Sequence, residues 1–366
     1  MARRQPESEI YLVDNQWRRT LVKSVGSNSI SPILSLKERF QKLKLIHPLA
    51  YLHEFDITTP ELDKLIKEVR PDIVFHAAQQ ASAHYAMRGV KESIETIRNN
   101  EEGNMRLLWA LKHFAPECHL LKLGSFGEYS TGNLPVAEGY YIPSYNGVLS
   151  DNPVPYPRES DDVYHITKIN DTNFISMACR KWGLKVTDIM QATIFGFYTD
   201  ETDESLITRF DYDEFFGTVL NRFVAQAVTG IPLSVYGSGH QRTGLMSLVD
   251  AVDSLVTLAT EKIERGQHKV VNHVVEKDFS IIELATTVQQ YCIKLGIETS
   301  IDNGTYDPRS ENLQKKKSYN IETSHLQKVR HHGLFDVIEH ALATIRKYEK
   351  RINQGIIAPS FSWKKS

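Results

Sequence analysis

Short runs of apolar residues, many of them β-branched, alternate with segments of helical period through roughly the first half of the chain. The runs that we interpret as strands are EIYLVD, AYLHEFDIT, DIVFHAA, HLLKLGS and LKVTDIMQA, which begin at residues 9, 50, 72, 119 and 184. Strands that alternate with helices are typical of βαβ units. The pattern therefore predicts an α/β fold with a mostly parallel, doubly wound sheet.

Three of the intervening segments are predicted as helices. The segment TPELDKLIKEVRP has Thr59 as its N-cap, Pro60 at the first helical position and Pro71 just beyond its end. A long amphipathic helix is predicted over residues 91–114, and another over about 161–182. Each of these helices separates two predicted strands.

The second half of the chain follows the alternation less closely. Residues 131–160 are rich in Pro, Gly, Asn and Tyr, and we interpret them as a long functional loop across the edge of the sheet. We expect residues 1–195 to form one domain. Residues 196–366 are expected to form mainly a smaller substrate-binding lobe, with some segments returning to the first domain. Such a lobe would cover the carboxyl ends of the strands, where open α/β sheets bind their ligands.

Composition narrows the possible partners. The 366 residues carry a net charge of −2, without the basic excess that nucleic acid or an anionic membrane would favour. Small molecules or proteins are the expected partners. The three cysteines lie far apart without metal-site spacing, which argues against disulfides and structural zinc. No apolar run is long enough to span a bilayer, and the first residues lack the apolar core of a signal peptide, so we expect a cytoplasmic protein.

A tyrosine and a lysine in the segment VYHITK form the first group with possible chemistry. Tyr164 and Lys168 are four residues apart on a predicted helix and share one face. A nearby ammonium favours the phenolate form of a tyrosine, which can then take a proton from a substrate hydroxyl. Ser125 follows the predicted strand HLLKLGS and could hydrogen-bond the same substrate oxygen. Taken separately, each residue could also be an ordinary surface or turn residue.

Three earlier strand ends indicate a dinucleotide. Asp14 follows its strand where a carboxylate can accept hydrogen bonds from a ribose diol, and Asp56 and Ile57 end the next strand. Ala77 and Ala78 end the third strand with small side chains that allow the cofactor to approach the backbone. The succession of these ends, followed by Ser125 and the Tyr164 helix, predicts a dinucleotide site.

The chain resembles the extended short-chain dehydrogenases, also called NAD-dependent epimerase/dehydratases, over nearly its whole length. Within them it is most similar to the UDP-sulfoquinovose synthases of sulfolipid biosynthesis. The stretches that carry the resemblance are YLVDNQWRR, KLGSFGEYS, YHITKINDTN, TDIMQATIFGFYTDE, RFDYDEFFGTVLNRF, PLSVYGSGHQ and YDPRSEN. The last five are specific to that subgroup.

The resemblance implies a reaction on UDP-glucose. C4 is oxidised by NAD⁺, the C5 proton becomes acidic, water leaves from C6, sulfite adds there and hydride returns to C4. Tyr164 would be the base at O4, Lys168 would lower its pKa and hold the nicotinamide ribose, and Ser125 stands at the catalytic Thr or Ser position. His165 is a candidate acid or base at C5 or C6, and a packed helix histidine is an equal alternative. Phe126 and Gly127 replace the Asp-Glu pair of ordinary hexose dehydratases.

The resemblance also implies binding residues and a homodimer through the helices 91–114 and 161–182. For NAD these residues are Asp14, Asn15, Gln16, Trp17, Arg18, Arg19, Asp56, Ile57, Ala77, Ala78, Asn99, Asn100, Tyr164, Lys168 and Ile194. For the nucleotide sugar they are Ser125, Gln191, Thr218, Asn221, Arg222, Ser234, Val235, Tyr236, Arg242 and Arg309. The planar fork of an arginine suits a pyrophosphate.

Two differences from the motifs of the subgroup weaken the prediction that the enzyme uses sulfite. The subgroup's Gln-Arg-Ser is Gln80, Ala81 and Ser82 here, and its Gln-Thr-Arg-Gly becomes the segment 241–244, which reads QRTG. Sulfite is an anion that needs a cationic or amide-rich pocket, and Arg242 or His84 are the candidates to compensate. We therefore predict a nucleotide-sugar enzyme more firmly than the sulfite step. A 4-epimerase that does not use sulfite is the first alternative, and a non-catalytic binding protein is the second.

The glycine-rich turn that binds the pyrophosphate is absent from the sequence. The first glycine is Gly26 and the next is Gly89, so no GxxGxxG precedes the first strand. In a Rossmann-like sheet of order 3-2-1-4-5-6 the strand that carries this turn lies at the centre. Without it, the neighbouring strands are expected to have unpaired edges. A start codon assigned too late, a shortened inactive relative and a partner chain that supplies the unit remain open. A chain that begins at Met1 is expected to bind NAD poorly.

Overall fold

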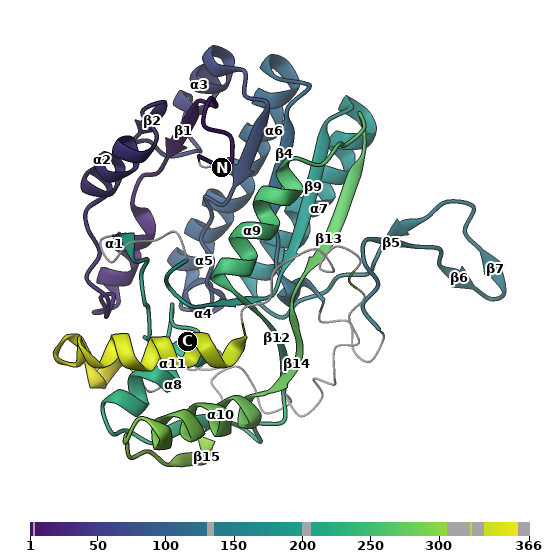
Figure 1. The fold of residues 1–366 in the computed structure, drawn as a ribbon. Helices are drawn as coiled ribbons and strands as arrows, with labels where there is room; N and C mark the ends of the chain where they lie inside the picture. The colour runs from purple at the N-terminus through teal and green to yellow at the C-terminus, as the bar shows by residue number, and fades with distance from the viewer. Residues whose placement is uncertain (3, 130–134, 200–205, 306–322, 324–332, 358–366) are drawn as a thin grey trace.

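The structure is a computed structural model of the chain. It describes residues 1–2, 4–129, 135–199, 206–305, 323 and 333–357. Figure 1 shows helices packed on a central parallel sheet, with a lobe of helices and short strands below it and a hairpin that projects to one side. Among the described residues, no helix is both long enough and apolar enough to cross a membrane.

The central sheet has four parallel strands. Their order is β13 (His268–His273), β9 (Lys185–Gln191), β4 (His119–Leu123) and β3 (Ile73–His76). Three of these strands lie in the apolar runs predicted to form them, so the α/β fold with a parallel sheet is confirmed. The apolar side chains of β4 and β9 are buried because helices cover both faces.

A second, separate sheet consists of β1 (Ile10–Val13) and β2 (Ala50–His53), which pair in parallel. In the order of a Rossmann sheet these strands take places two and three, and β3 takes place four. Within the described ranges β1 pairs only with β2, and β3 pairs only with β4. The predicted unpaired edges are therefore present, and Phe75 on β3 leaves 40% of its surface exposed.

The helices of the first half surround these two sheets. They are α1 (Trp17–Ser24), α2 (Leu36–Ile46), α3 (Glu61–Val69), α4 (Ala83–Ala86), α5 (Val90–Ile97), α6 (Gly103–Phe114) and α7 (Val163–Trp182). The prediction for the first turn of α3 was wrong by one residue: Pro60, and not Thr59, is the N-cap. The predicted single helix 91–114 is interrupted by the π-helical turn η1 (Arg98–Glu102), which local periodicity does not reveal.

The segment predicted as a long loop contains short strands. β5 (Tyr140–Tyr141) pairs antiparallel with β8 (Val154–Pro155), and between them β6 (Ser144–Tyr145) pairs with β7 (Val148–Leu149). These strands form the projecting hairpin of Figure 1. Each strand has only two residues, too short for an alternating pattern to be visible in the sequence.

Elements beyond residue 195 build the lower lobe. Its strands are β10 (Thr193–Phe195), β12 (Arg242–Ser247) and β14 (Glu276–Ser280) in one sheet, and β11 (Leu233–Tyr236) and β15 (Ile301–Thr305) in another. Its helices are α8 (Val219–Val228), α10 (Ile281–Lys294) and α11 (Leu334–Arg346), with the 3-10 turns η6 (Glu349–Arg351) and η7 (Gln354–Ile356). Their apolar faces share one buried cluster.

Two elements from the second half of the chain lie with the first. The strand β13 extends the central sheet beside β9, and the helix α9 (Leu248–Ala259) contributes Leu258 and Ala259 to the core against that sheet. The boundary at residue 195 stays a prediction.

Candidate active site

The predicted catalytic residues of the VYHITK helix meet the end of β4. Ser125 follows this strand and caps the 3-10 turn η2 (Phe126–Glu128), while Tyr164 and Lys168 lie on the first turns of α7. The Lys168 ammonium lies 5.7 Å from the centre of the Tyr164 ring, and Ser125 is near enough to lower the pKa of the Tyr164 phenol. The three side chains can therefore act on one substrate oxygen.

Burial determines the protonation of Tyr164. It raises the pKa of this phenol well above its ordinary value, and the nearby carboxylates of Glu128 and Asp162 raise it further. The Ser125 hydroxyl acts in the opposite direction and lowers this pKa, because a nearby donor stabilises the phenolate. In this arrangement Tyr164 is a neutral hydroxyl at pH 7 that needs a route for its proton before it can act as a base.

The Lys168 ammonium is held by two acceptors. Its ammonium donates to the carbonyl of Leu123 at 2.6 Å and to the side-chain oxygen of Gln79. The Gln79 amide in turn donates to Asp171 at 2.5 Å. Burial, followed by the positive charge of Lys122, lowers the pKa of Lys168. The lysine is thus fixed in place and is an unusually acidic ammonium.

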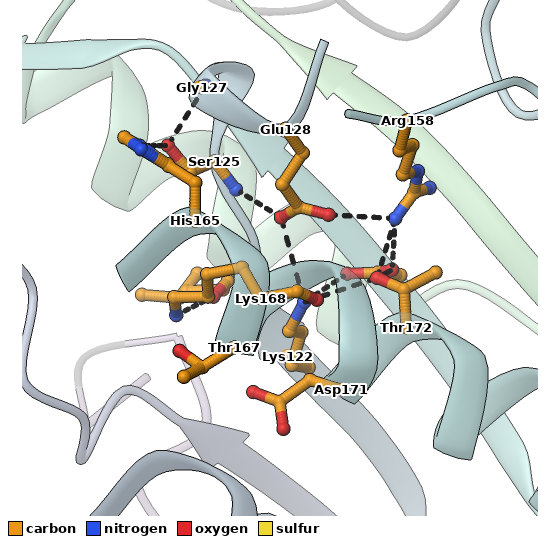
Figure 2. A network of polar contacts seen from close by, with 12 residues as sticks. Lys122, Ser125, Gly127, Glu128, Arg158, His165, Thr167, Lys168, Asp171 and Thr172 are labelled. Atoms are coloured by element: carbon orange, nitrogen blue, oxygen red, sulfur yellow. Dashed lines mark hydrogen bonds and ion pairs between the residues drawn. The ribbon is translucent and has the colours of Figure 1, made fainter. Parts of the chain in front are cut away.

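His165 lies at the same site and faces Ser125. Its Nε2 is 3.1 Å from the Ser125 hydroxyl (Figure 2). Its Nδ1 is 2.6 Å from the carboxylate of Asp162. Gly127 leaves room for the ring, because a Cβ at this position would lie 2.0 Å from Nε2. The position fits the predicted acid or base, and the chemical role itself stays a prediction.

A cluster of buried charges lies behind these residues (Figure 2). Glu128 accepts from the backbone N–H of Ser125 at 2.9 Å and from the guanidinium of Arg158 at 2.9 Å. Lys122 lies 3.3 Å from Asp188 and 3.8 Å from Glu128, and all three side chains are fully buried. Arg158 also lies 3.5 Å from Asp188. Since buried ions are tolerated only with partners, this cluster fixes the backbone of Ser125.

The sequence contains a pattern that indicates this buried charge cluster. Lys122 and Asp188 each interrupt an otherwise apolar strand, HLLKL and KVTDIMQ. They are also direct register partners on β4 and β9. Opposite charges in the middle of two buried strands indicate a pair between neighbours. Asp162, Gln79 and Asp171 were missed as well, because they are adjacent to the site only after folding.

The residues at the end of β1 form the candidate adenosine end of a cofactor site. Asp14 and Asn15 are exposed there, and Asn15 donates to Asp56 at 2.9 Å across the two strands. Arg18 and Arg19 turn away and pair with Asp211 at 3.1 and 3.3 Å. An available carboxylate with its arginines neutralised suits an unphosphorylated ribose diol, as in NAD.

The remaining predicted cofactor residues lie in different surroundings. Ala77 and Ala78 are exposed just past β3, as a cofactor surface requires. Asn99 and Asn100 are buried in η1 and accept from the backbone N–H of Gln80 at 3.0 and 2.8 Å, so they hold the neighbouring loop. Of the others, Gln16 is exposed, Trp17 packs on the apolar face of α1, Ile57 packs against α6 and Ile194 lies on β10.

The residues present fit the two ends of NAD. Asp14 would hold the adenosine ribose, and Tyr164 and Lys168 would face the nicotinamide ribose and the substrate. Between these ends, the described residues contain no strand that pairs with both β1 and β3. Among the described residues, no strand therefore joins the adenosine end of the site to the nicotinamide end.

The predicted sugar-nucleotide residues lie mostly in the lower lobe. Thr218 caps α8 by accepting from the N–H of Asn221, whose amide donates to the carbonyl of Asp211. The Arg222 guanidinium lies 3.0 Å from the Tyr236 hydroxyl and over its ring. These residues form a polar group at the start of α8, and the contact with Tyr236 fixes the position of the Arg222 guanidinium in this group.

The other predicted substrate-binding residues lie on several different elements. Ser234 is held by Gln226, and Val235 is buried in the lobe's core. Gln191 ends β9, and Arg242 on β12 lies 3.4 Å from Glu283. Arg309 lies outside the described residues.

Comparison with known proteins identifies relatives of the whole chain. The model of the NAD dependent epimerase/dehydratase family matches residues 19–272. Chloroplastic UDP-sulfoquinovose synthase of Spinacia oleracea is 36% identical over 367 residues, which cover 98% of this chain and 74% of the spinach protein. The UDP-sulfoquinovose synthase of Sulfolobus acidocaldarius is 32% identical, and the match covers 98% of this chain and 92% of that protein.

Solved structures with the same fold share much less sequence. UDP-glucuronic acid 4-epimerase from Bacillus cereus in complex with NAD has a TM-score of 0.66 at 17% identity, over 94% of this chain and 93% of that one. UDP-glucose 4-epimerase from Thermotoga maritima with UDP-glucose has a TM-score of 0.61 at 16% identity, over 92% and 98%. The chain therefore belongs to the NAD-dependent epimerase/dehydratase family, in its UDP-sulfoquinovose synthase subgroup, and is an NAD-dependent enzyme of that kind.

Proposed function

We propose that this enzyme, which modifies a nucleotide sugar, makes a sulfonated sugar from UDP-glucose and sulfite. In the proposed sequence C4 is oxidised, C5 loses a proton, C6 loses water, sulfite adds at C6 and C4 is reduced. The observation that carries the proposal is the position of His165, 3.1 Å from Ser125 and beside Tyr164. A C4 oxidation needs one base, whereas elimination at C5 and C6 needs a second acid or base at the same site.

The chain's own residues have separate tasks in this proposal. NAD, when bound, supplies the hydride chemistry at C4, with Asp14 and Lys168 as the residues that would hold its two riboses. Tyr164 takes the proton of the C4 hydroxyl, and Ser125 holds that oxygen. His165 takes the C5 proton and protonates the leaving hydroxyl at C6. Arg222 binds the pyrophosphate of the sugar nucleotide, and Arg242 or His84 attracts the sulfite anion.

Product analysis separates this proposal from its alternatives. The chain is incubated with UDP-glucose, millimolar NAD and labelled sulfite, with Tyr164→Phe as the inactive control. We expect a sulfonated UDP-sugar that depends on sulfite. Formation of UDP-galactose without any sulfonated product would instead indicate a 4-epimerase. Binding of UDP-glucose without conversion at saturating NAD would support the non-catalytic binding protein.

We also propose a cytoplasmic homodimer. Apolar residues are exposed along α5 and at one position on α7: Val90 by 78%, Ile94 by 54%, Ile97 by 43% and Ile166 by 41%. Exposed apolar side chains in a row on packed helices are typical of a protein interface. Sedimentation of the chain should give a dimer, and I94E should give a monomer.

The free, buried cysteines support a reducing compartment, such as the cytoplasm.

A further inference from the structure

Gln79 lies between two residues of opposite charge that could pair with each other. Lys168 and Asp171 are both on α7, at a spacing of i and i+3 that brings side chains of a helix together. In the structure both bond the side chain of Gln79 instead. The Lys168 ammonium donates to the amide oxygen, and the amide nitrogen donates to Asp171 at 2.5 Å. Gln79 thus separates a buried ammonium from a buried carboxylate.

The chemistry of the three groups fixes the orientation of the Gln79 amide. An ammonium only donates hydrogen bonds and a carboxylate only accepts them, whereas a glutamine side chain does both without carrying a charge. The amide oxygen must therefore face Lys168, and the nitrogen must face Asp171. A glutamate at this position would repel Asp171, and an apolar side chain would bond neither neighbour.

The loop after β3 holds the backbone of Gln79 in place. The next residue, Gln80, donates its backbone N–H to the side-chain oxygens of Asn99 and Asn100, and the Asn100 amide donates back to the Gln80 carbonyl at 3.1 Å. The Gln80 amide also donates to Thr96 at 2.9 Å. Because these contacts attach the loop to α5 and η1, Gln79 reaches Lys168 from a fixed backbone.

Asp171 would attract Lys168 if Gln79 did not bond both. Its Oδ1 is buried and no described residue hydrogen-bonds it, so this oxygen is an unsatisfied acceptor. Burial raises the pKa of Asp171 against the opposing charges of Lys122 and Lys168, and direct contact with the ammonium would stabilise the carboxylate. Asp171 follows Lys168 along α7 whereas Tyr164 precedes it. Pairing with Asp171 would therefore draw the ammonium away from the tyrosine.

We propose that Gln79 is a positioning residue that keeps the Lys168 ammonium near Tyr164 by preventing it from pairing with Asp171. The inference rests on the proposed function only for the identity of the substrate. The carbonyl of Leu123, at the end of β4, accepts a second proton of the ammonium at 2.6 Å. Since an ammonium has three protons, Gln79 and Leu123 leave one for a bound group.

Two variants separate this role from general support of the fold. Q79M keeps the length of the side chain and removes both hydrogen bonds, so the ammonium is free to reach Asp171. Q79M/D171N also removes the competing charge. If Gln79 only supported the fold, a second substitution in the same buried site would add to the damage. If Gln79 keeps the two charges apart, D171N should restore part of what Q79M loses.

The first measurement needs neither cofactor nor substrate. Nitrogen NMR of the ¹⁵N-lysine-labelled chain follows the titration of Lys168, and K168M assigns its signal. The titratable groups that act on Lys168 or contact it are Tyr164 and Asp171 on α7, His76 on β3, Lys122 on β4, Glu128 on η2 and Asp188 on β9. None of them is substituted in Q79M, so a change reports the new position of the ammonium.

The sign of the change decides between the two roles. Direct pairing with Asp171 should raise the pKa of Lys168 in Q79M by about 1, at the low end of the effect of an opposite charge in contact. Loss of the Gln79 oxygen alone would lower this pKa, because the ammonium loses an acceptor. In Q79M/D171N the pKa should fall below that of Q79M. An unchanged or lower pKa of Lys168 in Q79M would overturn the proposal.

The second measurement is the steady-state rate with saturating NAD and UDP-glucose. Q79M should lose about 10²-fold in kcat, the cost of a group misplaced by about 1 Å. Q79M/D171N should be about tenfold faster than Q79M, within the coupling range of neighbouring residues. A double variant that is no faster than Q79M would refute the proposal.

Two controls keep the outcome clear. Thermal melting checks that the variants fold, and Q79S, which also removes both hydrogen bonds, replaces Q79M if that variant does not fold. If the wild type converts no sugar nucleotide, the proposed function has failed. The titration of Lys168 still decides whether Gln79 keeps it from Asp171.

Discussion

The two halves of the candidate site differ in how completely the surrounding sheet supports them. The catalytic half, at the ends of β4 and α7, lies on a continuous sheet and is fixed by buried, partnered charges. The cofactor half lies at the ends of β1 and β3, which belong to separate sheets. The comparison indicates that the continuous sheet positions the candidate catalytic residues, and we predict that binding of the cofactor depends on the centre of the sheet, between β1 and β3.

Side-chain packing shows the same difference. Leu121 on β4 is fully buried, while its register partner on β3, Phe75, is 40% exposed. The β1–β2 sheet is anchored mainly through α1, where Arg18 pairs with Asp211 and Leu21 and Val22 pack against Tyr85. The smaller sheet is thus held to the lobe as much as to the central sheet.

The largest effect is expected from the catalytic tyrosine. Tyr164→Phe keeps the buried ring and removes the hydroxyl that exchanges protons, so kcat should fall by up to about 10⁴-fold. Rates with UDP-glucose at saturating NAD measure the effect, and an unchanged melting temperature is the control. A loss smaller than about tenfold would mean that Tyr164 is not the base.

Breaking the buried charge cluster should strongly destabilise the catalytic half. Asp188→Asn leaves Lys122 buried without its nearest carboxylate, and removal of one partner from a buried pair costs about 3–5 kcal/mol. Urea unfolding measures the free energy. The double variant K122M/D188L removes both charges and should be less destabilised than D188N. Equal stability of D188N and wild type would show that the cluster is not a fixed part of the core.

The register partners on β4 and β3 offer a matched test of the two halves. Leu121→Ala should cost about 2–5 kcal/mol, because it leaves a cavity in a packed core. Phe75→Ala should cost clearly less, because much of the Phe75 ring already contacts water. The free energies of unfolding are compared under the same conditions. If the two substitutions cost the same, the edge of β3 is covered and the two halves do not differ.

A smaller effect is expected where Gly127 makes room for His165. A methyl group at this position would lie 2.0 Å from Nε2, so the imidazole must move away from Ser125. Gly127→Ala should lower kcat about tenfold, in the range of a misplaced catalytic group, with little change in stability. Gly89→Ala is the control, since its added methyl group would meet only the end of the Glu92 side chain. Equal rates for both variants would contradict the placement of His165.

The last prediction concerns how the free energy of unfolding changes with pH. Burial, and then the charges of Lys168 and Lys122, lowers the pKa of His76 to about 3. The unfolded chain binds this proton first, near pH 6.5, so stability is complete above that pH and is lost as the pH falls toward 3. The free energy of unfolding should decrease by at most about 1.4 kcal/mol per pH unit. His76→Gln should show a shallower slope between pH 6.5 and 5, and an identical slope would be evidence against a buried neutral His76.

Sequence reasoning succeeded where the signal is local. An apolar run such as HLLKL must be buried on both sides, so strands and the parallel sheet could be predicted. The motif that places Tyr164 and Lys168 on one helix face is local as well. The split of the sheet was also predictable, because the glycine turn that belongs to the central strand is missing from the sequence.

The rest depends on contacts between distant segments. The π-helical turn at Asn99 and Asn100 is stabilised by the backbone of Gln80, about twenty residues away. The pairing of Asp162 with His165 depends on where α7 begins, and a helix boundary is the least certain feature of a sequence-based prediction. The fixation of Lys168 by Gln79 and Asp171 requires β3 and α7 to be adjacent. Such contacts become visible only in the folded chain.

The contrast between the two halves is tested most directly by calorimetric binding of UDP-glucose and of NAD to the same 366-residue chain. Because no described strand joins β1 to β3, where a pyrophosphate-binding turn is expected, NAD should bind with a Kd of about 1 mM or weaker, equivalent to about −4.1 kcal/mol. UDP-glucose should bind at least about tenfold more tightly, a difference of about 1.4 kcal/mol. Micromolar binding of NAD by this chain would contradict the account, because it would show that the cofactor half is already complete.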